Sequence, residues 1–370
     1  MAGNESTTAE RTAQAADRAS EYDVVVVGGA AAGLSGALAL ARARRSVAVV
    51  DAGDPRNAPA AHVHNYLGRE GAAPGELYKV GRGEVAGYGG TLIPGTVSTV
   101  TRNPDGRFEV LLDDGRLLRA RRVLAASGAR DVLPDVPGLA EHWGTGVLHC
   151  PYCHGWEVQD RAIGILASDL GAALHQALLW RQWSDDVVLF LNGCGEPDDG
   201  QAEQLAARGI RVVSGEVAAV ESTTGEGEPV LSGVRLSSGE LVPRQAVVVF
   251  SRLSARAGYL ADLGIKPEEQ FMGELSIGTA VPVDPAGATS IPGVYAAGNL
   301  AVPMMQVIGS AAAGLAAGAA INGDLMAEDT AEAVAASRQR GLQDSGPGRR
   351  LQQVQRGRLR QEVARMRDGS

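Results

Sequence analysis

Two cysteines, Cys150 and Cys153, are separated by two residues and followed directly by His154. Thiols at this spacing lie close enough to close a small disulfide ring and to reopen it. A neighbouring imidazole can take up and return a thiol proton near neutral pH, which favours the reactive thiolate. The segment therefore predicts thiol–disulfide redox chemistry, with Cys150, Cys153 and His154 as catalytic groups.

Two other uses of a cysteine pair compete with redox catalysis. A structural disulfide is disfavoured because Cys194 is the only other cysteine in 370 residues, whereas extracellular proteins braced by disulfides carry several pairs. The pair could also be half of a zinc site completed by His149 or His154. Structural zinc sites normally bring a second Cys/His pair at similar spacing, and the sequence has none. We therefore expect no metal.

The composition indicates a globular chain that is long enough for two domains. Hydrophobic residues make up 45% of the chain and the net charge is −9, so neither nucleic-acid nor membrane binding is predicted. Residues 1–20 are polar, which predicts disorder and no secretory signal, and the apolar stretch 309–321 is too short to span a bilayer. We expect a cytoplasmic protein, where a cysteine pair is more often catalytic than structural.

The elements nearest the N-terminus form a nucleotide-binding pattern. Residues 24–27 are four valines, which predicts a strand buried on both faces, followed by a glycine turn and a helix to about Arg44. A second strand, residues 46–50, ends at Asp51. This is the opening βαβ unit of a dinucleotide-binding sheet. Three short segments between Thr91 and Leu118 predict a small antiparallel addition.

The turn after the first strand supplies the residues expected to bind a dinucleotide. They are Gly28, Gly29, Ala30 and Gly33. Glycine lets the backbone approach a pyrophosphate, and the N-terminus of the following helix favours its negative charge. Ala30 replaces the middle glycine of the usual pattern, which a ligand can accommodate by a slight shift. Asp51 lies 23 residues after Gly28, where a carboxylate accepts hydrogen bonds from a ribose.

A second strand–turn–helix–strand unit follows the cysteine pair. Its strands are predicted at residues 162–167 and 187–191 and its helix at about 172–183, with more strands over 210–250. The fold class is therefore α/β, with two Rossmann-like domains of the three-layer ββα type. A helix of small residues is expected over 309–322. Residues 327–370 form an Arg-rich tail that most resembles a solvated helix, because acidic and apolar positions are interleaved.

The run 291–299, Ile-Pro-Gly-Val-Tyr-Ala-Ala-Gly-Asn, places a glycine and a polar side chain between a strand and a helix. The positive end of that helix would stabilise the negative charge of a reduced flavin. An ordinary strand–loop–helix explains this run equally well.

Together, five runs resemble the thioredoxin-reductase-like FAD-dependent pyridine nucleotide-disulfide oxidoreductases, over roughly residues 22–326. They are VVVVGGAAAGL with Asp51, HVHNYLG, LAASGARDVLP, CPYCHG, and IPGVYAAGNL followed by MMQVIGSAAAG. The resemblance implies a discontinuous FAD-binding domain, residues 21–140 and 282–326, and an inserted NAD(P)-like domain, residues 141–281, that carries the cysteine pair. It also implies a homodimer.

The resemblance assigns roles residue by residue. Gly28, Gly33 and Asp51 would hold the ADP half of FAD, and the flavin half would lie along Asn65, Gly128, Gly298, Asn299 and Gln306. Asn299 departs from the aspartate that is usual in the family. Cys153 would be the sulfur that faces the flavin, and Cys150 the sulfur that exchanges with substrate. His154, where the thioredoxin reductases have Asp, is similar to the dithiol oxidases that close disulfides in metabolites.

The inserted domain departs from the pattern of an NADPH site. Its turn reads Ala-Ser-Asp-Leu-Gly over residues 167–171, and the aspartate would face a pyrophosphate. Residues 192–196, after the next strand, include no arginine to pair with a 2′-phosphate. NADPH binding is therefore doubtful.

The leading hypothesis is an FAD-dependent oxidase that converts a dithiol, either a small molecule or a thioredoxin-like protein, to a disulfide with O₂ as acceptor. The first alternative is an NADPH-dependent thioredoxin or disulfide reductase. The second, from another class, is a non-enzymatic redox sensor that binds FAD and whose tail engages a partner.

Overall fold

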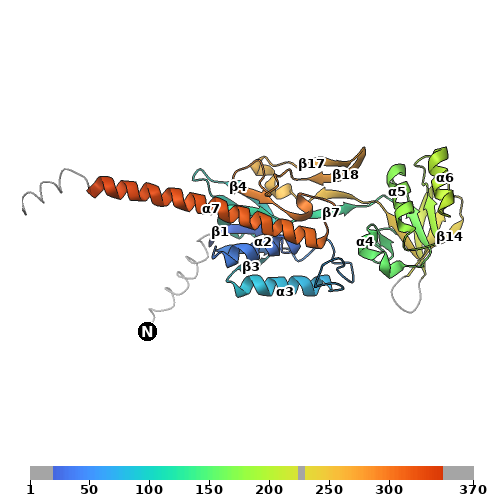
Figure 1. The fold of residues 1–370 in the computed structure, drawn as a ribbon, viewed down its shortest axis with the longest axis horizontal. Helices are drawn as coiled ribbons and strands as arrows, with labels where there is room; N and C mark the ends of the chain where they lie inside the picture. The colour runs from blue at the N-terminus through green and yellow to red at the C-terminus, as the bar shows by residue number, and fades with distance from the viewer. Residues whose placement is uncertain (1–19, 224–229, 345–370) are drawn as a thin grey trace, which may run out of the picture. The chain divides into compact units, whose positions relative to one another are not determined.

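The computed structural model describes residues 20–223 and 230–344, and its largest sheet has seven strands (Figure 1). The strands run in the order β3-β2-β1-β6-β5-β4, and β19 pairs with β6. Their bounds are Ser20–Val27 (β1), Val47–Asp51 (β2), Thr91–Pro94 (β3), Val97–Arg102 (β4), Phe108–Leu112 (β5), Leu117–Ala125 (β6) and Val294–Ala296 (β19). Strands β3, β2, β1, β6 and β19 are parallel, so their carboxyl ends open on one edge of the sheet.

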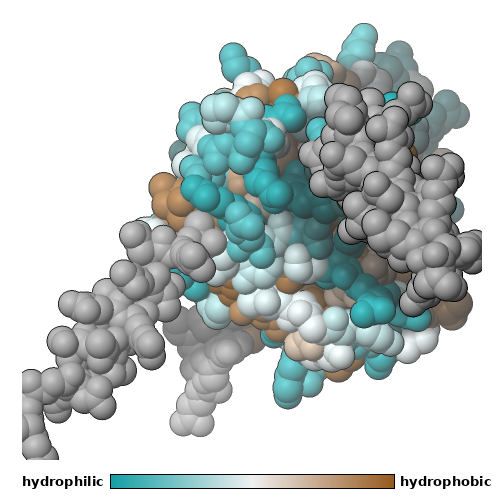
Figure 2. Space-filling view, turned by 90° about the vertical axis from the view of Figure 1, so that its left-hand side faces the viewer, coloured by the Kyte–Doolittle hydropathy of each residue, from teal (hydrophilic) through white to brown (hydrophobic). Residues whose placement is uncertain are grey.

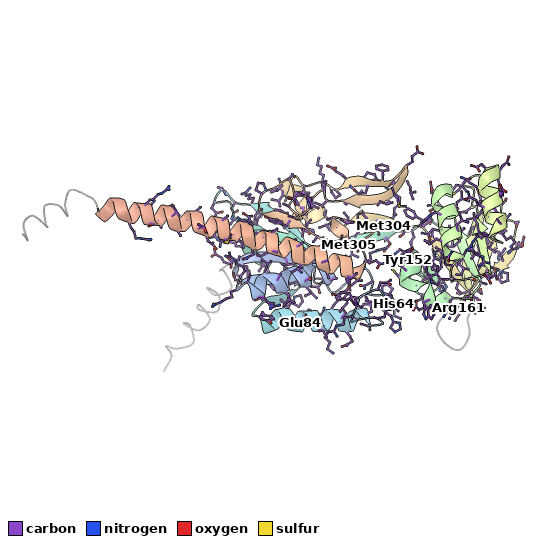
Figure 3. The ribbon with its side chains drawn as sticks, viewed as in Figure 1. His64, Glu84, Tyr152, Arg161, Met304 and Met305 are labelled. Carbon is purple, nitrogen blue, oxygen red and sulfur yellow. The ribbon has the colours of Figure 1, made fainter. Side chains whose placement is uncertain are left out.

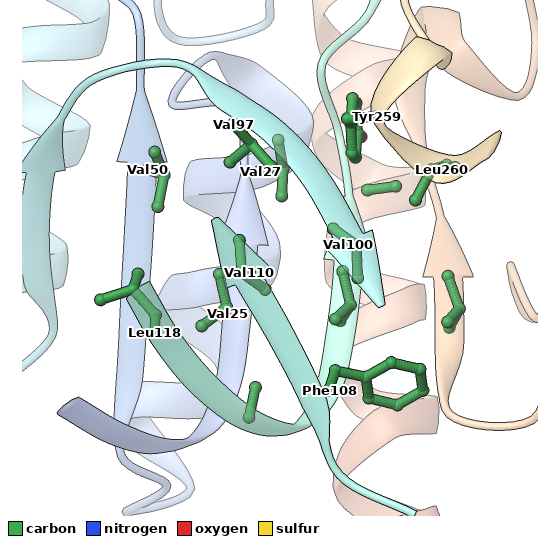
Figure 4. Close-up of a cluster of buried hydrophobic side chains, with 14 of the residues drawn as sticks. Val25, Val27, Val50, Val97, Val100, Phe108, Val110, Leu118, Tyr259 and Leu260 are labelled. Carbon is green, nitrogen blue, oxygen red and sulfur yellow. The ribbon is translucent and has the colours of Figure 1, made fainter. Parts of the chain in front are cut away.

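Both faces of this sheet are covered, which explains why β1 is apolar at successive positions rather than at alternate ones. Helix α2 (Ala31–Arg42) and helix α3 (Pro74–Gly87) belong to one layer. The other face contributes Val25 and Val27 to a core completed by β4, β5 and the short helix η2 (Gly258–Leu263), as Figure 4 shows. The buried ring of Phe108 and the aliphatic chain of Leu260 lie in this core.

Close helix packing joins the two parts of the sequence that build this layer. Helix α7 spans Val307–Asp344, and a Cβ atom added at Gly314 would lie 1.9 Å from the Ala32 carbonyl oxygen of α2. A Cβ atom at Gly36 would likewise lie 2.9 Å from the Gly314 carbonyl oxygen. Only glycine allows the backbones of α2 and α7 to approach so closely.

A second sheet of five parallel strands has the order β11-β10-β9-β15-β8. The bounds of its strands are Val147–Leu148 (β8), Ile163–Leu166 (β9), Val187–Phe190 (β10), Arg211–Val213 (β11) and Ala246–Val249 (β15). Helices α5 (Leu170–Trp180) and α6 (Asp199–Ala207) connect its strands. A three-stranded sheet adds Val217–Thr223 (β12), Val230–Leu236 (β13) and Leu241–Pro243 (β14). The cysteine pair lies between β8 and β9, at helix α4 (Pro151–His154), which is followed by η1 (Trp156–Val158).

A four-stranded sheet, in the order β17-β18-β16-β7, crosses the predicted domain limits. Its strands are Ala129–Val132 (β7), Arg252–Ala255 (β16), Glu268–Met272 (β17) and Leu275–Ala280 (β18). Strand β16 pairs antiparallel with β7, although the sequence predicts the two strands in different domains. The domain limits at residues 140 and 281 remain a proposal.

The predicted α/β class with two Rossmann-like units is confirmed, two local predictions need revision, and one helix was not predicted. The segment 91–94 is not part of an antiparallel addition, because β3 pairs in parallel with β2. Helix α3 is not predicted from the sequence, since Gly75, Gly81 and Gly83 dilute its apolar pattern. The predicted helix 309–322 is part of the longer helix α7, which runs to Asp344.

The chain divides into two compact units, residues 1–321 and 322–370. In the second unit, the described residues 322–344 belong to helix α7, and those from 327 onward lie in the predicted tail. The disorder predicted for residues 1–20 falls outside the described residues except for Ser20, which begins β1, and the tail beyond 344 also lies outside them. None of the described helices is long and apolar enough to cross a bilayer. The face drawn in Figure 2 is mostly hydrophilic, with small separate hydrophobic patches.

Candidate functional site

A cavity of about 1160 Å³ contains nearly all the residues that the sequence predicts for the site. The predicted residues that line it are Gly28, Gly29, Ala30, Asp51, Gly128, Cys150, Cys153, His154, Gly298, Asn299 and Gln306. Gly33 and Asn65 do not line it. Side chains from three separate segments, His64, Tyr152 and the pair Met304 and Met305, also border it (Figure 3). The cavity therefore joins the glycine turn to the cysteine pair.

The glycine turn has a shape that side chains would block. Gly28 has a φ angle of +108°, and a Cβ atom there would lie 2.4 Å from the Ala126 carbonyl oxygen. A Cβ atom at Gly33 would lie 1.8 Å from the Gly28 carbonyl oxygen, so Gly33 supports the turn from behind rather than from the cavity. Ala30 has an extended backbone, with φ −100°, so its position does not require glycine.

The N-terminus of helix α2 is free to bind an anion. Among the described residues no side chain caps it, and its first turn has no acidic residue. The backbone N–H of Gly29 donates to Asp51 Oδ1 over 3.1 Å, which fixes the carboxylate beside the turn. Free N–H groups for a pyrophosphate and a carboxylate for a ribose are the groups that the ADP half of FAD needs. The residues present therefore fit FAD.

The run that ends β19 shapes the other end of the cavity. Gly298 begins the short helix η3 (Gly298–Leu300) with φ +70°, and a Cβ atom there would lie 2.9 Å from the Ala32 Cβ. The Asn299 Nδ2 group donates to the carbonyl oxygens of Pro303 and Met305, at 2.7 and 2.9 Å. An ionised aspartate has no N–H to donate, so the amide found here holds a loop that the usual aspartate could not hold in this way.

Asn65 contacts the cysteine turn instead of the cavity. Its Nδ2 group donates to the Tyr152 carbonyl oxygen over 2.6 Å, and its own backbone takes a positive φ of 59°. The preceding His64 lies between two carboxylates, with Nδ1 2.6 Å from Glu70 and Nε2 3.2 Å from Glu157. The segment 62–65 thus holds the turn that carries the two cysteines.

The two cysteine sulfurs lie 2.7 Å apart, and Cys150 precedes the first turn of α4. A hydrogen bond from the Cys153 thiol lowers the pKa of Cys150 to about 7, helped by backbone N–H groups and by the positive charge of Arg56 and opposed by burial. The same hydrogen bond, together with burial, raises the pKa of Cys153. Cys150 is therefore the sulfur that is a thiolate near neutral pH, which suits attack, exchange and departure.

This difference predicts a pH profile for alkylation of the reduced protein. The rate constant for iodoacetamide at Cys150 should rise about tenfold per pH unit below pH 7 and level off above it, because only the thiolate reacts. In a Cys153→Ser variant the hydrogen bond to the Cys150 sulfur changes, and the midpoint of the pH profile should rise toward the ordinary pKa of a thiol. Peptide mapping by mass spectrometry identifies the alkylated sulfur, and a midpoint for Cys150 above pH 8.5 would contradict the assignment.

His154, predicted as a proton carrier, lies beside the cysteines. Burial lowers the pKa of His154, while the negative charge of Glu157 opposes that shift. Its ring makes an edge contact with the ring of His149, with centroids 6.4 Å apart. A neutral imidazole in this place can accept a proton from a thiol at physiological pH.

A group of partly buried polar residues next to the cysteines was not predicted from the sequence. Arg56 forms a two-pronged salt bridge with Asp131, with both contacts at 2.7 Å, and its Nη2 lies 3.3 Å from His149 Nε2. Ser251 donates to the same aspartate over 2.8 Å. Arg56 and Asp131 are 75 positions apart, so no spacing in the sequence signals their contact. From the sequence, His149 is predicted only as a possible zinc ligand.

In the inserted domain, the strand–helix turn that would face NADPH carries an aspartate whose carboxylate binds the N-terminus of the following helix. Asp169 caps helix α5, and its Oδ1 accepts from the backbone N–H of Ala172 over 2.8 Å. Beyond β10, Asp198 caps α6 in the same way and Glu196 accepts from Ser214. Among residues 20–223 and 230–344, no three His, Cys, Asp or Glu side chains gather as a metal site.

Comparisons with known proteins agree with this geometry. The family model described as pyridine nucleotide-disulphide oxidoreductase matches residues 22–318. Thioredoxin reductase sirT from Leptosphaeria maculans is 31% identical over 324 residues, which is 84% of this chain and 96% of the relative. Among solved structures, HlmI is 45% identical with a TM-score of 0.78, covering 86% of this chain and 96% of its own. Thioredoxin reductase TrxB from Bacillus anthracis is 30% identical with a TM-score of 0.75, covering 83% and 99%.

The matched family spans both Rossmann-like units and includes the cysteine pair, the glycine turn and the cavity between them. The chain therefore belongs to the pyridine nucleotide-disulphide oxidoreductases, as a flavin-dependent disulfide oxidoreductase of the thioredoxin reductase type.

Proposed function

We propose that this protein is a dithiol oxidase, which takes electrons from a dithiol substrate and passes them to O₂. The observation that carries the proposal is the contrast between two helix N-termini. Helix α2 has no side-chain cap among the described residues, whereas the N-terminus of α5 is occupied by the carboxylate of Asp169. A pyrophosphate at α5 would have to displace this carboxylate or lie against its negative charge.

The residues at the position expected for the 2′-phosphate of NADPH also argue against NADPH as the electron donor. Between β10 and the first turn of α6 the chain carries Glu196, Asp198 and, as the first residue of α6, Asp199, and no arginine. The first two are engaged with neighbouring groups of the chain, so their charges are fixed in place. Carboxylates repel a phosphate, and a selective site for NADPH places arginine there instead.

The cysteines exchange electrons with the substrate in two balanced steps. A substrate thiolate attacks Sγ of Cys150 in the enzyme disulfide, which breaks the Cys150–Cys153 bond and releases Cys153 as a thiolate. The second substrate thiol, deprotonated by His154, attacks the substrate sulfur of the mixed disulfide and releases Cys150. The substrate leaves as a disulfide, and the enzyme keeps its two electrons in the reduced cysteine pair and the proton of the second substrate thiol on His154. Cys150 suits this departure because its pKa lies at about 7.

When bound, FAD would supply the relay that takes two electrons from the thiols and passes them, with two protons, to O₂ as hydrogen peroxide. Gly28, Gly29 and Asp51 would hold its ADP half, and Gly128, Asn299 and Gln306, which line the same cavity, would lie along its flavin half.

Anaerobic titration of the flavoprotein tests the direction of electron flow. A dithiol should bleach the flavin absorbance at least about 10²-fold faster than NADPH at equal concentration, because only the dithiol has a working entry site. In Cys150→Ser, bleaching by dithiol should disappear, while any direct reduction by NADPH should persist, since that path bypasses the cysteines. Faster bleaching by NADPH in the unmodified protein would reject the proposal.

The second candidate is an NADPH-dependent disulfide reductase, which the similarity to thioredoxin reductase sirT favours. It requires NADPH to bind through contacts other than the α5 turn. The same titration decides between the two, because a reductase would consume NADPH in the presence of an oxidised disulfide substrate and would need no O₂.

A further inference from the structure

His149 lies at the centre of the polar group beside the cysteines, and the proposed chemistry leaves it without a task. Its ring stacks on Trp143, with centroids 5.4 Å apart and an angle of 26° between the planes. Its Nε2 atom lies 3.3 Å from Nη2 of Arg56. Stacking fixes the plane of the imidazole, and the contact with Arg56 fixes its rotation within that plane.

The contact with Arg56 also fixes where the imidazole proton lies. A guanidinium has only N–H groups and donates in every hydrogen bond it makes, so Nε2 of His149 must accept. An accepting Nε2 means a neutral ring with its proton on Nδ1. Asp131 holds Arg56 by two contacts of 2.7 Å, and Ser251 holds Asp131 by a third of 2.8 Å, so the donor cannot easily turn away.

The charges around the ring of His149 also favour its neutral form. Burial and the positive charge of Arg56 lower the pKa of His149 to about 3, with a smaller contribution from His154, while Asp131 opposes the shift. Cys150, the next residue, becomes an anion only near pH 7 and above. His149 is therefore neutral through the physiological range and, with Nε2 engaged, cannot serve as a general base.

Among the described residues, none engages the remaining nitrogen of the His149 ring. Nδ1 of His149 makes no hydrogen bond to any residue in the described ranges, 20–223 and 230–344. The only buried side-chain nitrogen or oxygen without a partner in those ranges is Nε of Arg256, so Nδ1 is not enclosed. Since His149 lines the cavity together with Trp143 and Cys150, this N–H is exposed to whatever binds beside the reactive sulfur.

We propose that His149 binds the substrate by a hydrogen bond from Nδ1–H to an acceptor atom next to the reacting sulfur, and that Arg56 and Asp131 are positioning residues that fix its tautomer. This inference rests on the proposed function, because it places a dithiol in the cavity. The two histidines that flank the cysteine pair then have separate tasks. His149 orients the substrate without changing its charge, and His154 alone carries protons. The substrate accordingly carries a hydrogen-bond acceptor, such as an amide carbonyl, close to its thiols.

Nitrogen NMR of the ¹⁵N-histidine-labelled holoprotein tests the tautomer without any turnover. His149→Gln removes one signal and so assigns it. In the unmodified protein that signal should show a proton on Nδ1 and no titration from pH 5 to 8. In Arg56→Met, with Nε2 released, it should titrate, with its midpoint shifted toward the ordinary value of about 6.5. Arg56→Lys serves as a second variant should Arg56→Met fail to fold. Titration of His149 in the unmodified protein between pH 5 and 8 would overturn the proposal.

Steady-state kinetics test the contact with substrate. His149→Phe keeps a ring to stack on Trp143 but has no N–H, and it should raise KM for the dithiol about tenfold with a smaller change in kcat. In His149→Gln, KM should lie close to that of the unmodified protein, because the glutamine amide can accept from Arg56 and donate to the substrate. An unchanged KM in His149→Phe would overturn the substrate contact. If NADPH proves to be the reductant, the proposed function fails, while the NMR result still decides the tautomer.

Discussion

Replacement of Cys150 by serine is expected to lower dithiol turnover by on the order of 10³-fold or more, while the protein keeps its flavin. The hydroxyl of serine is not ionised near neutral pH and forms no disulfide, so both exchange steps are lost together. The flavin should stay bound because the residues expected to hold it, Gly28, Gly29 and Asp51, lie in other segments of the chain. Oxygen consumption with a dithiol measures turnover, and the flavin spectrum measures retention.

Cys153→Ser is the matched control, because it removes the other sulfur and leaves Cys150 reactive. Offered the disulfide form of the substrate, Cys153→Ser should form a stable mixed disulfide at Cys150, which intact-mass spectrometry detects as a substrate-sized addition. Cys150→Ser should show no such addition. An addition at Cys153 in Cys150→Ser, with none in Cys153→Ser, would reverse the roles assigned to the two sulfurs.

Substitution of Gly33 by alanine is expected to weaken flavin binding by about 10²-fold and to destabilise the fold by about 3 kcal/mol. The added methyl group would lie 1.8 Å from the Gly28 carbonyl oxygen, which is backbone and cannot move aside as a side chain can. Either the turn or the start of α2 must shift, and both carry the N–H groups expected to face the pyrophosphate. Flavin retained after dialysis and denaturant unfolding of the flavin-free protein measure the two effects separately.

Gly83→Ala is the control for this prediction. Gly83 lies exposed in helix α3, with no heavy atom within 4 Å of an added Cβ. Alanine there should leave flavin binding unchanged and stabilise the protein by up to about 1 kcal/mol, because it restricts the unfolded chain. Equal losses of flavin in Gly33→Ala and Gly83→Ala would show that the close approach of Gly33 to Gly28 has no special role.

The sequence alone was sufficient for the elements whose signals are local. Four consecutive valines, a glycine turn and Asp51 at the end of the next strand predict β1, α2 and β2, because strand burial and turn conformation depend on adjacent residues. The cysteine pair and His154 are adjacent in the chain, so their contact follows from spacing. Asp169 is also predicted from its position, since the side chain of an acidic residue at a strand–helix turn accepts from the backbone N–H groups of the helix that follows.

The contacts that only the tertiary structure decides join residues far apart in the chain. Strand β3 belongs to the main sheet because of its pairing with β2, and β16 meets β7 across 120 positions or more. Asn65 matches a cofactor-binding run, yet its amide lies on the carbonyl of Tyr152. Pairing of this kind depends on the complete arrangement of the sheets, which no short window of sequence contains.

The cysteine pair shows which features of the site follow from the sequence and which depend on the tertiary structure. The sequence determined that two thiols and an imidazole are close, because they lie within five consecutive residues. The folded chain decided their chemistry, since it brings Arg56 from the loop after β2 and Asp131 from β7 to the side of His149. The half-buried arginine is stabilised there by its carboxylate partner, and their pairing exists only after the two segments have met.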